Sequence, residues 1–453
     1  MKKITYILLS ACFLLTSCED FLNRDPDAKV GSGDYFTDEG SLLTYINGFI
    51  QKYTPSAADL GYGDGYSDIM ATEKSFTFLT NASWTPDLQS GWSISNWTPI
   101  YNINYFLVHM REAKGLSEAT YNHYEGTARF WRAWQYFEKV KTFGAVPWYD
   151  EPIDPEDMVA LYKPRDSREY VMERVLEDLN YACEHCYTSE AWVNNQKINR
   201  YIALAIKSRI CLFEGTYRKY HNLNLDGHDA NFYLDLAAKA ALEIIEKGPY
   251  KLYQTGHPEK DYLTLFAQKD ASPEEYILAI KFDYAIGARH NASAYTLLPT
   301  QGRPGLTRKF INTYLMDNGT AFTDKPGWQE MQFIEETDGR DPRLAQSIRT
   351  PGYTRIGQTE VEGPMFETTV TGYQPVKFVQ DPTSNSNNND RVDSSDCDMP
   401  VYRFGEVLLI YAEAKAELGT LTQDDLTISI NKLRDRVGMP PLDMAKANAK
   451  PDW

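Results

Sequence analysis

The chain has 453 residues, with 63 acidic side chains against 46 lysines and arginines, so its formal net charge is −17. This acidity excludes nucleic acid as a favoured partner, because binding to the phosphate backbone requires a basic surface. Aromatic residues make up 13% of the chain, more than a core requires, and the surplus of Tyr and Trp favours an exposed recognition surface.

The N-terminus has the pattern of a cleavable export signal. Two lysines precede an apolar run, residues 4–15, that is shorter than the roughly 20 residues needed to span a bilayer. The run closes with Leu15-Thr16-Ser17-Cys18, as a bacterial lipoprotein signal does. We therefore predict that residues 1–17 are removed and that Cys18 carries the lipid, palmitate among its acyl chains, which anchors the mature chain 18–453 in a membrane. An ordinary secretory signal with a chance cysteine is the alternative.

Helical periodicity dominates residues 97–255 and returns in residues 400–440. The predicted helices are 127–143, a helix opened by Ser167 that runs to Cys186, a helix around 203–213, and then 236–247, 407–418 and 426–437. The 127–143 helix has apolar residues on two sides, which indicates packing on both sides in a stacked array. The last two helices, joined by a turn at Gly419, have the form of a tetratricopeptide-like pair. We predict a mainly α fold, a superhelix of such pairs with an irregular, loop-rich portion.

Two loop-rich regions, residues 59–96 and 256–399, adjoin the helical blocks. Loops on a rigid helical scaffold are where binding residues usually lie. The segment 381–398 is rich in Asn, Ser and Asp, so we predict a mobile, solvated surface loop there. Its acidic residues lack the spacing of an EF-hand calcium loop, and no metal site is predicted.

The few cysteines argue against a disulfide scaffold. Cys183 and Cys186 have the CxxC spacing of a metal or redox site, but both continue the apolar helical stripe of Met172, Val175 and Leu179. We therefore predict that both thiols lie in the core, and we predict no cofactor.

A series of short segments extends over nearly the whole mature chain: Cys18-Glu19-Asp20-Phe21-Leu22, Trp97-Thr98-Pro99-Ile100-Tyr101 with Asn104, Ala128-Arg129-Phe130-Trp131-Arg132-Ala133, Phe143-Gly144-Ala145-Val146-Pro147, Asp341-Pro342-Arg343-Leu344, Arg403-Phe404-Gly405-Glu406-Val407-Leu408-Leu409-Ile410-Tyr411-Ala412-Glu413-Ala414, and Asn431-Lys432-Leu433-Arg434. In this order they resemble the SusD/RagB family of outer-membrane nutrient-binding lipoproteins of the Bacteroidetes. Each segment alone is a weak signal, and the series as a whole identifies the family.

The resemblance implies a helical superhelix that carries an irregular ligand-binding half. It implies a lipid-anchored protein on the outer membrane, facing the cell exterior, that captures an oligosaccharide, or sometimes a peptide, for a SusC-like TonB-dependent transporter. It also implies that the protein is not an enzyme. The acidic residues after Cys18 resemble the signal that sends such lipoproteins to the outer face.

The sequence departs from the resemblance at one place. The family's chain continues beyond the helix that contains Leu433 into further helical sequence, whereas this sequence stops at Trp453. A truncated product, an incomplete sequence and a natural variant would each give this end. Loss of such a segment is expected to uncover part of the helical core.

A sugar ring presents C–H groups on one face and hydroxyls around its rim, so its site needs flat aromatic rings and planar hydrogen-bonding side chains. Trp84 is the first candidate, because Asn, Ser and Pro place it in a loop, and Trp92 is the second. The candidates in the second loop-rich region are Tyr284, Arg289, His290, Asn291, Tyr295 and Trp328. Each has a plain alternative role on the surface or in packing, and Trp97 is expected to belong to the core.

No catalytic residue is predicted, because HExxH, GxSxG and P-loop motifs are absent and no acidic pair stands apart as a glycosidase pair. Two other functions remain open. One is a peptide-binding or assembly scaffold of the outer membrane that uses grooves between its helices, and the less favoured one is a helical glycoside hydrolase.

Overall fold

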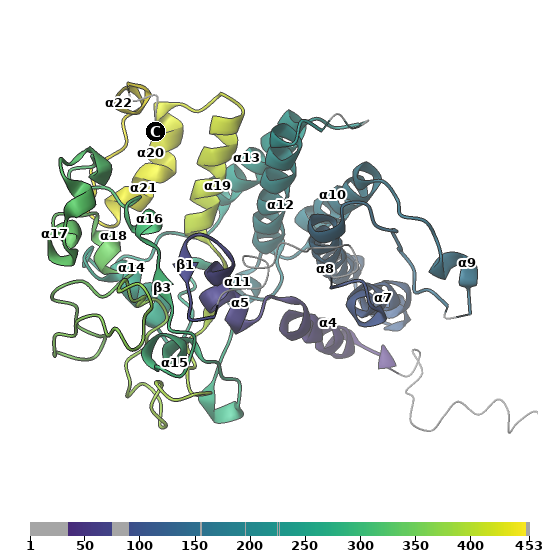
Figure 1. The fold of residues 1–453 in the computed structure, drawn as a ribbon. Coiled ribbons are helices and arrows are strands. Elements are labelled where there is room, and N and C mark those ends of the chain that lie inside the picture. Colours follow the sequence, from purple (N-terminus) through teal and green to yellow (C-terminus); the bar gives the residue numbers. More distant parts are fainter. Residues whose placement is uncertain are drawn as a thin grey trace, which may run out of the picture.

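The computed structural model describes residues 35–449, apart from 75–89 and the single positions 155, 195, 224 and 226. It is mainly helical, which confirms the predicted fold class (Figure 1). Cys18 and Trp84 lie outside the described residues. Within the described part of the chain, no helix is long and apolar enough to cross a membrane.

Long helices stacked side by side form the scaffold (Figure 1). They are α4 (Glu39–Tyr53), α7 (Ile94–His109), α8 (Glu118–Phe143), α10 (Arg168–His185), α12 (Arg200–Tyr220), α13 (Ala230–Lys247) and α19 (Phe404–Glu417). Helices α4, α7 and α10 all contact α8, and the series continues from α10 to α12, α13 and α19. One large apolar core runs through this array.

Helix α8 shows how local sequence sets these elements. It begins at Glu118 rather than at Thr127, because Ser117 caps it: the backbone N–H of Thr120 donates to the Ser117 hydroxyl at 3.1 Å. It ends at Phe143, where Gly144 takes a φ of 70° that suits glycine. Its neighbours lie on more than one side, which confirms the packing predicted from its two apolar faces.

The prediction for the last helix is wrong in one respect. Residues 426–437 were expected to form a single helix, but the structure has two short helices, α20 (Gln423–Ile428) and α21 (Ile430–Asp435). Ser429 separates them with ψ of −96°, and its hydroxyl donates to the carbonyl of Asp425. Its φ of −127° and ψ of −96° lie outside the helical range, so the helix is interrupted at this residue.

The remaining elements are short. The helices are α5 (Ala57–Tyr62), α9 (Met158–Leu161), α11 (Glu190–Val193), α14 (Asp261–Ala267), α15 (Ala292–Leu297), α16 (Arg308–Ile311), α17 (Phe333–Thr337), α18 (Pro342–Ala345) and α22 (Met444–Asn448). The 3-10 turns are η1 (Gly63–Tyr66), η3 (Met110–Glu112), η4 (Tyr284–Ile286), η5 (Phe322–Asp324) and η6 (Trp328–Glu330). The strands are β1 (Met70–Ala71), β2 (Tyr276–Ile280), β3 (Gly305–Leu306) and β4 (Met399–Arg403).

Two small antiparallel sheets connect distant parts of the chain. Strand β1 pairs with β3, with Met70 opposite Leu306, and β2 pairs with β4, with Tyr276 opposite Arg403. The first pair joins the two loop-rich regions, and the second joins the later region to the start of α19. Both loop-rich regions therefore meet on the same side of the scaffold (Figure 1).

The cysteines on α10 belong to the scaffold core. Cys183 and Cys186 are buried, and burial raises the pKa of each thiol to about 12. The interpretation of these residues as a continued apolar stripe is confirmed. Trp97 is half-buried and packs against the same core, with the ammonium of Lys139 4.3 Å from its ring.

Candidate functional site

A pair of stacked tyrosines lies where the two loop-rich regions meet. Tyr295 is on α15, and Tyr62 is the last residue of α5. Their ring centroids are 3.8 Å apart and their planes differ by 19°. Asn291 precedes Tyr295 by one helical turn, and the Tyr295 N–H donates to the Asn291 carbonyl at 2.7 Å. The structure therefore brings two predicted site residues, Asn291 and Tyr295, onto the same side of α15.

Gly302 fixes the position of the Tyr295 ring. A Cβ atom at Gly302 would lie 2.2 Å from Cε2 of Tyr295, which is closer than real Cβ contacts allow. Only glycine permits this approach. The Gly302 carbonyl also accepts a hydrogen bond from the N–H of Glu73 at 3.0 Å, which holds the loop after β1 in place.

A third tyrosine completes the aromatic group. Tyr66, at the end of η1, is 59% exposed. Burial raises the pKa of Tyr295, and the neighbouring phenols of Tyr62 and Tyr66 raise it further. The Tyr295 phenol therefore stays protonated near neutral pH and can donate a hydrogen bond. We call Tyr62, Tyr66 and Tyr295 the tyrosine platform.

Planar polar side chains border the platform. Asn291 and Asp393 are joined by two hydrogen bonds: the Asn291 amide donates to Asp393 Oδ1 at 3.1 Å, and the Asp393 N–H donates to Asn291 Oδ1 at 2.6 Å. Burial raises the pKa of Tyr62, and the charges of Asp393 and Asp59 add to this rise, which places Asp393 near that ring.

Arg303 lies beside the platform in a conformation that few side-chain-bearing residues adopt, with φ of 49°. Its Nη2 donates to the carbonyl of Phe366 at 3.0 Å, and its Nη1 lies 3.6 Å from Glu73 Oε1. Backbone strain of this kind is found where the surrounding structure determines a residue's position. Arg303 follows Gly302 directly, so it adds a cation to the loop that contacts Tyr295.

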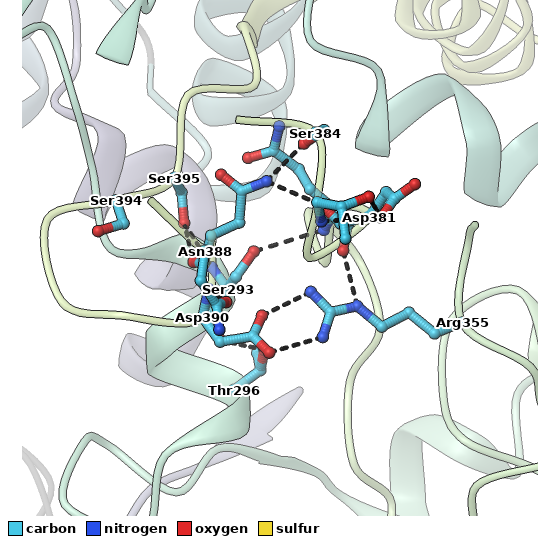
Figure 2. Close-up of polar contacts among 12 residues, drawn as sticks. Ser293, Thr296, Arg355, Asp381, Ser384, Asn388, Asp390, Ser394 and Ser395 are labelled. Carbon is cyan, nitrogen blue, oxygen red and sulfur yellow. Dashed lines mark hydrogen bonds and ion pairs between the residues drawn. The ribbon is translucent and has the colours of Figure 1, made fainter. Parts of the chain in front are cut away.

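The loop 381–398 packs against α15 (Figure 2). Arg355 is buried, and its two terminal nitrogens donate to Asp390 at 2.8 and 2.5 Å. The N–H of Ser293 donates to Ser395 Oγ at 3.1 Å, which ties the loop to α15. Residues 394–398 are buried, so the predicted mobile, solvated loop is wrong there. Its polar groups bond to one another and to the backbone instead of to water.

His290 precedes Asn291 and faces the protein interior. Its ring is buried, Nε2 lies 2.9 Å from the carbonyl of Cys397, and the N–H of Ala292 donates to Nδ1 at 3.2 Å. Burial lowers its pKa to about 4. Both ring nitrogens have partners within the protein, which leaves neither one free for a ligand.

Tyr284 and Arg289 form a small turn of their own. Residues 283 and 288 pair across it, and the Arg289 guanidinium carbon lies 4.9 Å from the Tyr284 ring. Arg289 is exposed and Tyr284 is half-buried. The turn precedes Asn291 directly, so both residues stay candidates at the edge of the site.

The two described tryptophan candidates lie elsewhere. Trp92 sits at the start of α7, edge-on to Trp97 and Phe143, with the Arg165 guanidinium carbon 4.5 Å from its ring. Trp328 is half-buried against Phe322 near α17. Figure 1 places α7 and α17 far apart, with α15 distant from α7. The structure does not bring either tryptophan to the tyrosine platform.

Tyr62 and Tyr66 were absent from the residues chosen from the sequence. Their segment, Gly61-Tyr62-Gly63-Asp64-Gly65-Tyr66, alternates glycine with tyrosine or aspartate inside the first loop-rich region. Tyrosines between glycines in a loop have no helical stripe to join, and this signal could have identified them.

Two protein-family models match this chain. A model described as the SusD family matches residues 275–451, and a model described as starch-binding associating with outer membrane matches residues 20–212. The two matches cover separate parts of the chain.

Curated relatives come from Formosa agariphila. SusD-like protein P38 is 22% identical over 97% of this chain and 84% of its own length. SusD-like protein P25 is 25% identical, and its alignment takes in 48% of this chain and 43% of that protein, so the chain matches less than half of P25.

Solved structures share the fold. A SusD-like carbohydrate-binding protein from Bacteroides fragilis NCTC 9343 superposes with a TM-score of 0.71 at 21% identity, covering 92% of this chain and 82% of that one. A protein solved with xylogluco-oligosaccharide superposes with a TM-score of 0.59 at 17% identity, covering 91% of this chain and 76% of that one. These similarities show the same mainly helical architecture.

Proposed function

Since the chain belongs to the SusD/RagB family, we propose that it is an outer-membrane lipoprotein that binds an oligosaccharide at the tyrosine platform. It faces the cell exterior, is anchored through Cys18, and passes its ligand to a SusC-like TonB-dependent transporter. It binds the nutrient without catalysing a reaction.

The stack of Tyr62 on Tyr295 is the observation that carries this proposal. An aromatic face packs against the C–H side of a pyranose ring, while planar amide and carboxylate groups bond to the hydroxyls at its rim. Asn291 and Asp393 supply such groups beside the rings. The carbohydrate-binding description of the Bacteroides fragilis neighbour supports a saccharide ligand.

Replacing Tyr62 with alanine is expected to weaken oligosaccharide binding by about 2 kcal/mol, roughly 30-fold in Kd, because one aromatic face is lost. Isothermal titration calorimetry with xylogluco- and malto-oligosaccharides measures this. Thermal unfolding of the variant checks that it remains folded.

Tyr162→Ala is the matched control, since Tyr162 is an exposed tyrosine next to α9, at the far end of the molecule (Figure 1). Its Kd should equal that of the unmodified protein. Equal affinities for both variants would remove the platform from the site, and sugar cleavage by the unmodified protein would favour a glycoside hydrolase instead.

Anchoring makes a separate prediction. A Cys18→Ala protein should bind oligosaccharide normally in solution but fail to support growth on it, because the tether raises the local concentration beside the transporter. Membrane fractionation and growth curves measure the two effects. Normal growth of this strain would contradict the proposed delivery to a transporter.

A further inference from the structure

A cluster of positive side chains surrounds one tyrosine on α14. The guanidinium carbon of Arg436 lies 5.1 Å from the Tyr262 ring centroid, and that of Arg403 lies 6.0 Å from it. Lys377 packs its ammonium 4.2 Å from the neighbouring Phe266 ring. Arg343 is the fourth member, close enough for its charge to act on the Tyr262 phenol. We call these four basic residues the cationic cluster.

Two carboxylates offset part of this charge. Glu275 accepts hydrogen bonds from Arg403 at 2.7 Å and from Arg436 at 2.9 Å, and it also accepts one from the Tyr253 N–H. Asp341 pairs with Arg343 at 2.6 Å. Both acids are therefore engaged, and the cluster keeps a surplus of positive charge in a protein whose formal net charge is −17.

Lys377 contributes much of this surplus positive charge. It forms no ion pair or hydrogen bond with any residue that the structure describes, and its side chain is exposed. The next residue, Phe378, is buried with φ of 63°, which is unusual for a large side chain. Burial of Phe378 in this strained conformation fixes the backbone that presents Lys377.

Hydrogen-bond donors without partners lie around the Tyr262 ring. Arg436 is 3% exposed, and its Nε has no hydrogen-bond partner. The Tyr262 hydroxyl also forms no hydrogen bond with the described residues. A buried, unpartnered guanidinium nitrogen is costly, so these donors favour an acceptor from outside the protein.

The electrostatic environment favours a negative charge at this position. Burial raises the pKa of the Tyr262 phenol, but the charges of Lys377, Arg403, Arg436 and Arg343 outweigh burial and lower that pKa below its usual value. Although much of the Lys377 side chain is exposed, loss of water around its ammonium lowers the pKa of Lys377, and the positive charge of Arg403 lowers it further. An anion would relieve this repulsion.

We propose that the cationic cluster binds an oxyanion group of the ligand, a carboxylate or a sulfate, so that the nutrient is an acidic saccharide. Arg side chains and a lysine ammonium are the usual partners of such groups. Arg343 and Arg403 are partly exposed, which leaves them accessible to solutes.

The cluster lies close to the segment that carries part of the tyrosine platform. Asp64, between Tyr62 and Tyr66 on η1, is close enough to Lys377 to oppose the lowering of its pKa. One saccharide could therefore place its rings on the platform and its acidic group at the cluster. In this respect the inference rests on the proposed oligosaccharide-binding function.

Titration with glucuronate, glucose 6-sulfate and neutral glucose tests the inference. Saturable binding of glucuronate or of the sulfate ester is expected, with no detectable binding of glucose. Tighter binding of glucuronate would identify the bound group as a carboxylate, and tighter binding of glucose 6-sulfate would identify it as a sulfate. Lys377→Met should weaken anion binding about tenfold, because one charge-assisted bond is lost, and Lys377→Arg should restore most of it.

Lys239→Met is the matched control, since it removes an exposed lysine from α13 and changes the net charge equally. Absence of anion binding by the unmodified protein, or equal loss in both methionine variants, would overturn the inference. Neutral oligosaccharide binding reports on the platform alone, so failure of the cluster and failure of the platform are distinguishable.

Discussion

Replacing Glu214 with alanine is expected to lower the free energy of unfolding by about 3–5 kcal/mol, the range for breaking a buried ion pair by removal of one partner. Glu214 on α12 is fully buried and accepts hydrogen bonds from Arg168 at 2.6 Å and from Arg218 at 2.8 Å. Arg218 is itself buried against Tyr233 of α13. The variant would leave both guanidinium groups with too few acceptors in the core.

The network also explains why the loss should be global. Arg168 begins α10 and Arg218 packs on Tyr233 of α13, so the network around Glu214 connects three successive helices of the scaffold. Urea unfolding followed by circular dichroism measures the effect. Glu184→Ala on exposed α10 surface is the control and should cost less than about 1 kcal/mol. A similar loss in both variants would mean that the buried network adds no special stability.

Acid should destabilise the protein before its carboxylates protonate. His123 is buried, its ring stacks on Tyr187 with centroids 3.7 Å apart, and its Nδ1 accepts the Tyr187 N–H at 3.1 Å. Burial lowers its pKa to about 3, and burial lowers that of His290 to about 4. Both rings stay neutral in the folded protein while the unfolded chain, with a histidine pKa near 6.5, takes up protons.

The sign of the effect follows from this difference. The unfolded state binds more protons below pH 6.5, so the stability present above that pH is lost as the pH falls toward 4. Each histidine contributes a slope of about 1.4 kcal/mol per pH unit. Urea unfolding between pH 7.5 and 5 measures how the free energy of unfolding changes with pH. His123→Gln should remove the contribution of one histidine from this slope. An unchanged slope in His123→Gln would contradict the assignment.

The scaffold could be predicted because its signals are local. Ser167 caps α10 as expected, and the Tyr170 N–H donates to its hydroxyl at 3.2 Å. Gly144 and Gly419 end their helices with positive φ. The interruption at Ser429 escaped prediction, because the apolar stripe continues through it.

The platform could be predicted only in part. Asn291 and Tyr295 were chosen from composition, but the stacking partner Tyr62 lies far away in the chain, and no periodicity connects two loops. His290 has the same loop neighbours as Asn291, yet it faces inward to Cys397. The polar composition of residues 394–398 predicts a solvated loop, but these residues are buried. The sequence does not reveal that their polar groups form hydrogen bonds within the protein. Long-range packing decides each of these cases.

The contact between Tyr62 and Tyr295 has a consequence for assembly of the molecule. The two rings come from distant segments, so the platform exists only after both loop-rich regions have docked on the helices. If ligand binds at the platform as proposed, a chain with its helices formed but its loops undocked would bind none. Ligand at a concentration a hundred times its Kd would therefore stabilise the completely folded molecule by about 2.7 kcal/mol. The nutrient would then increase the fraction of molecules whose loops are docked.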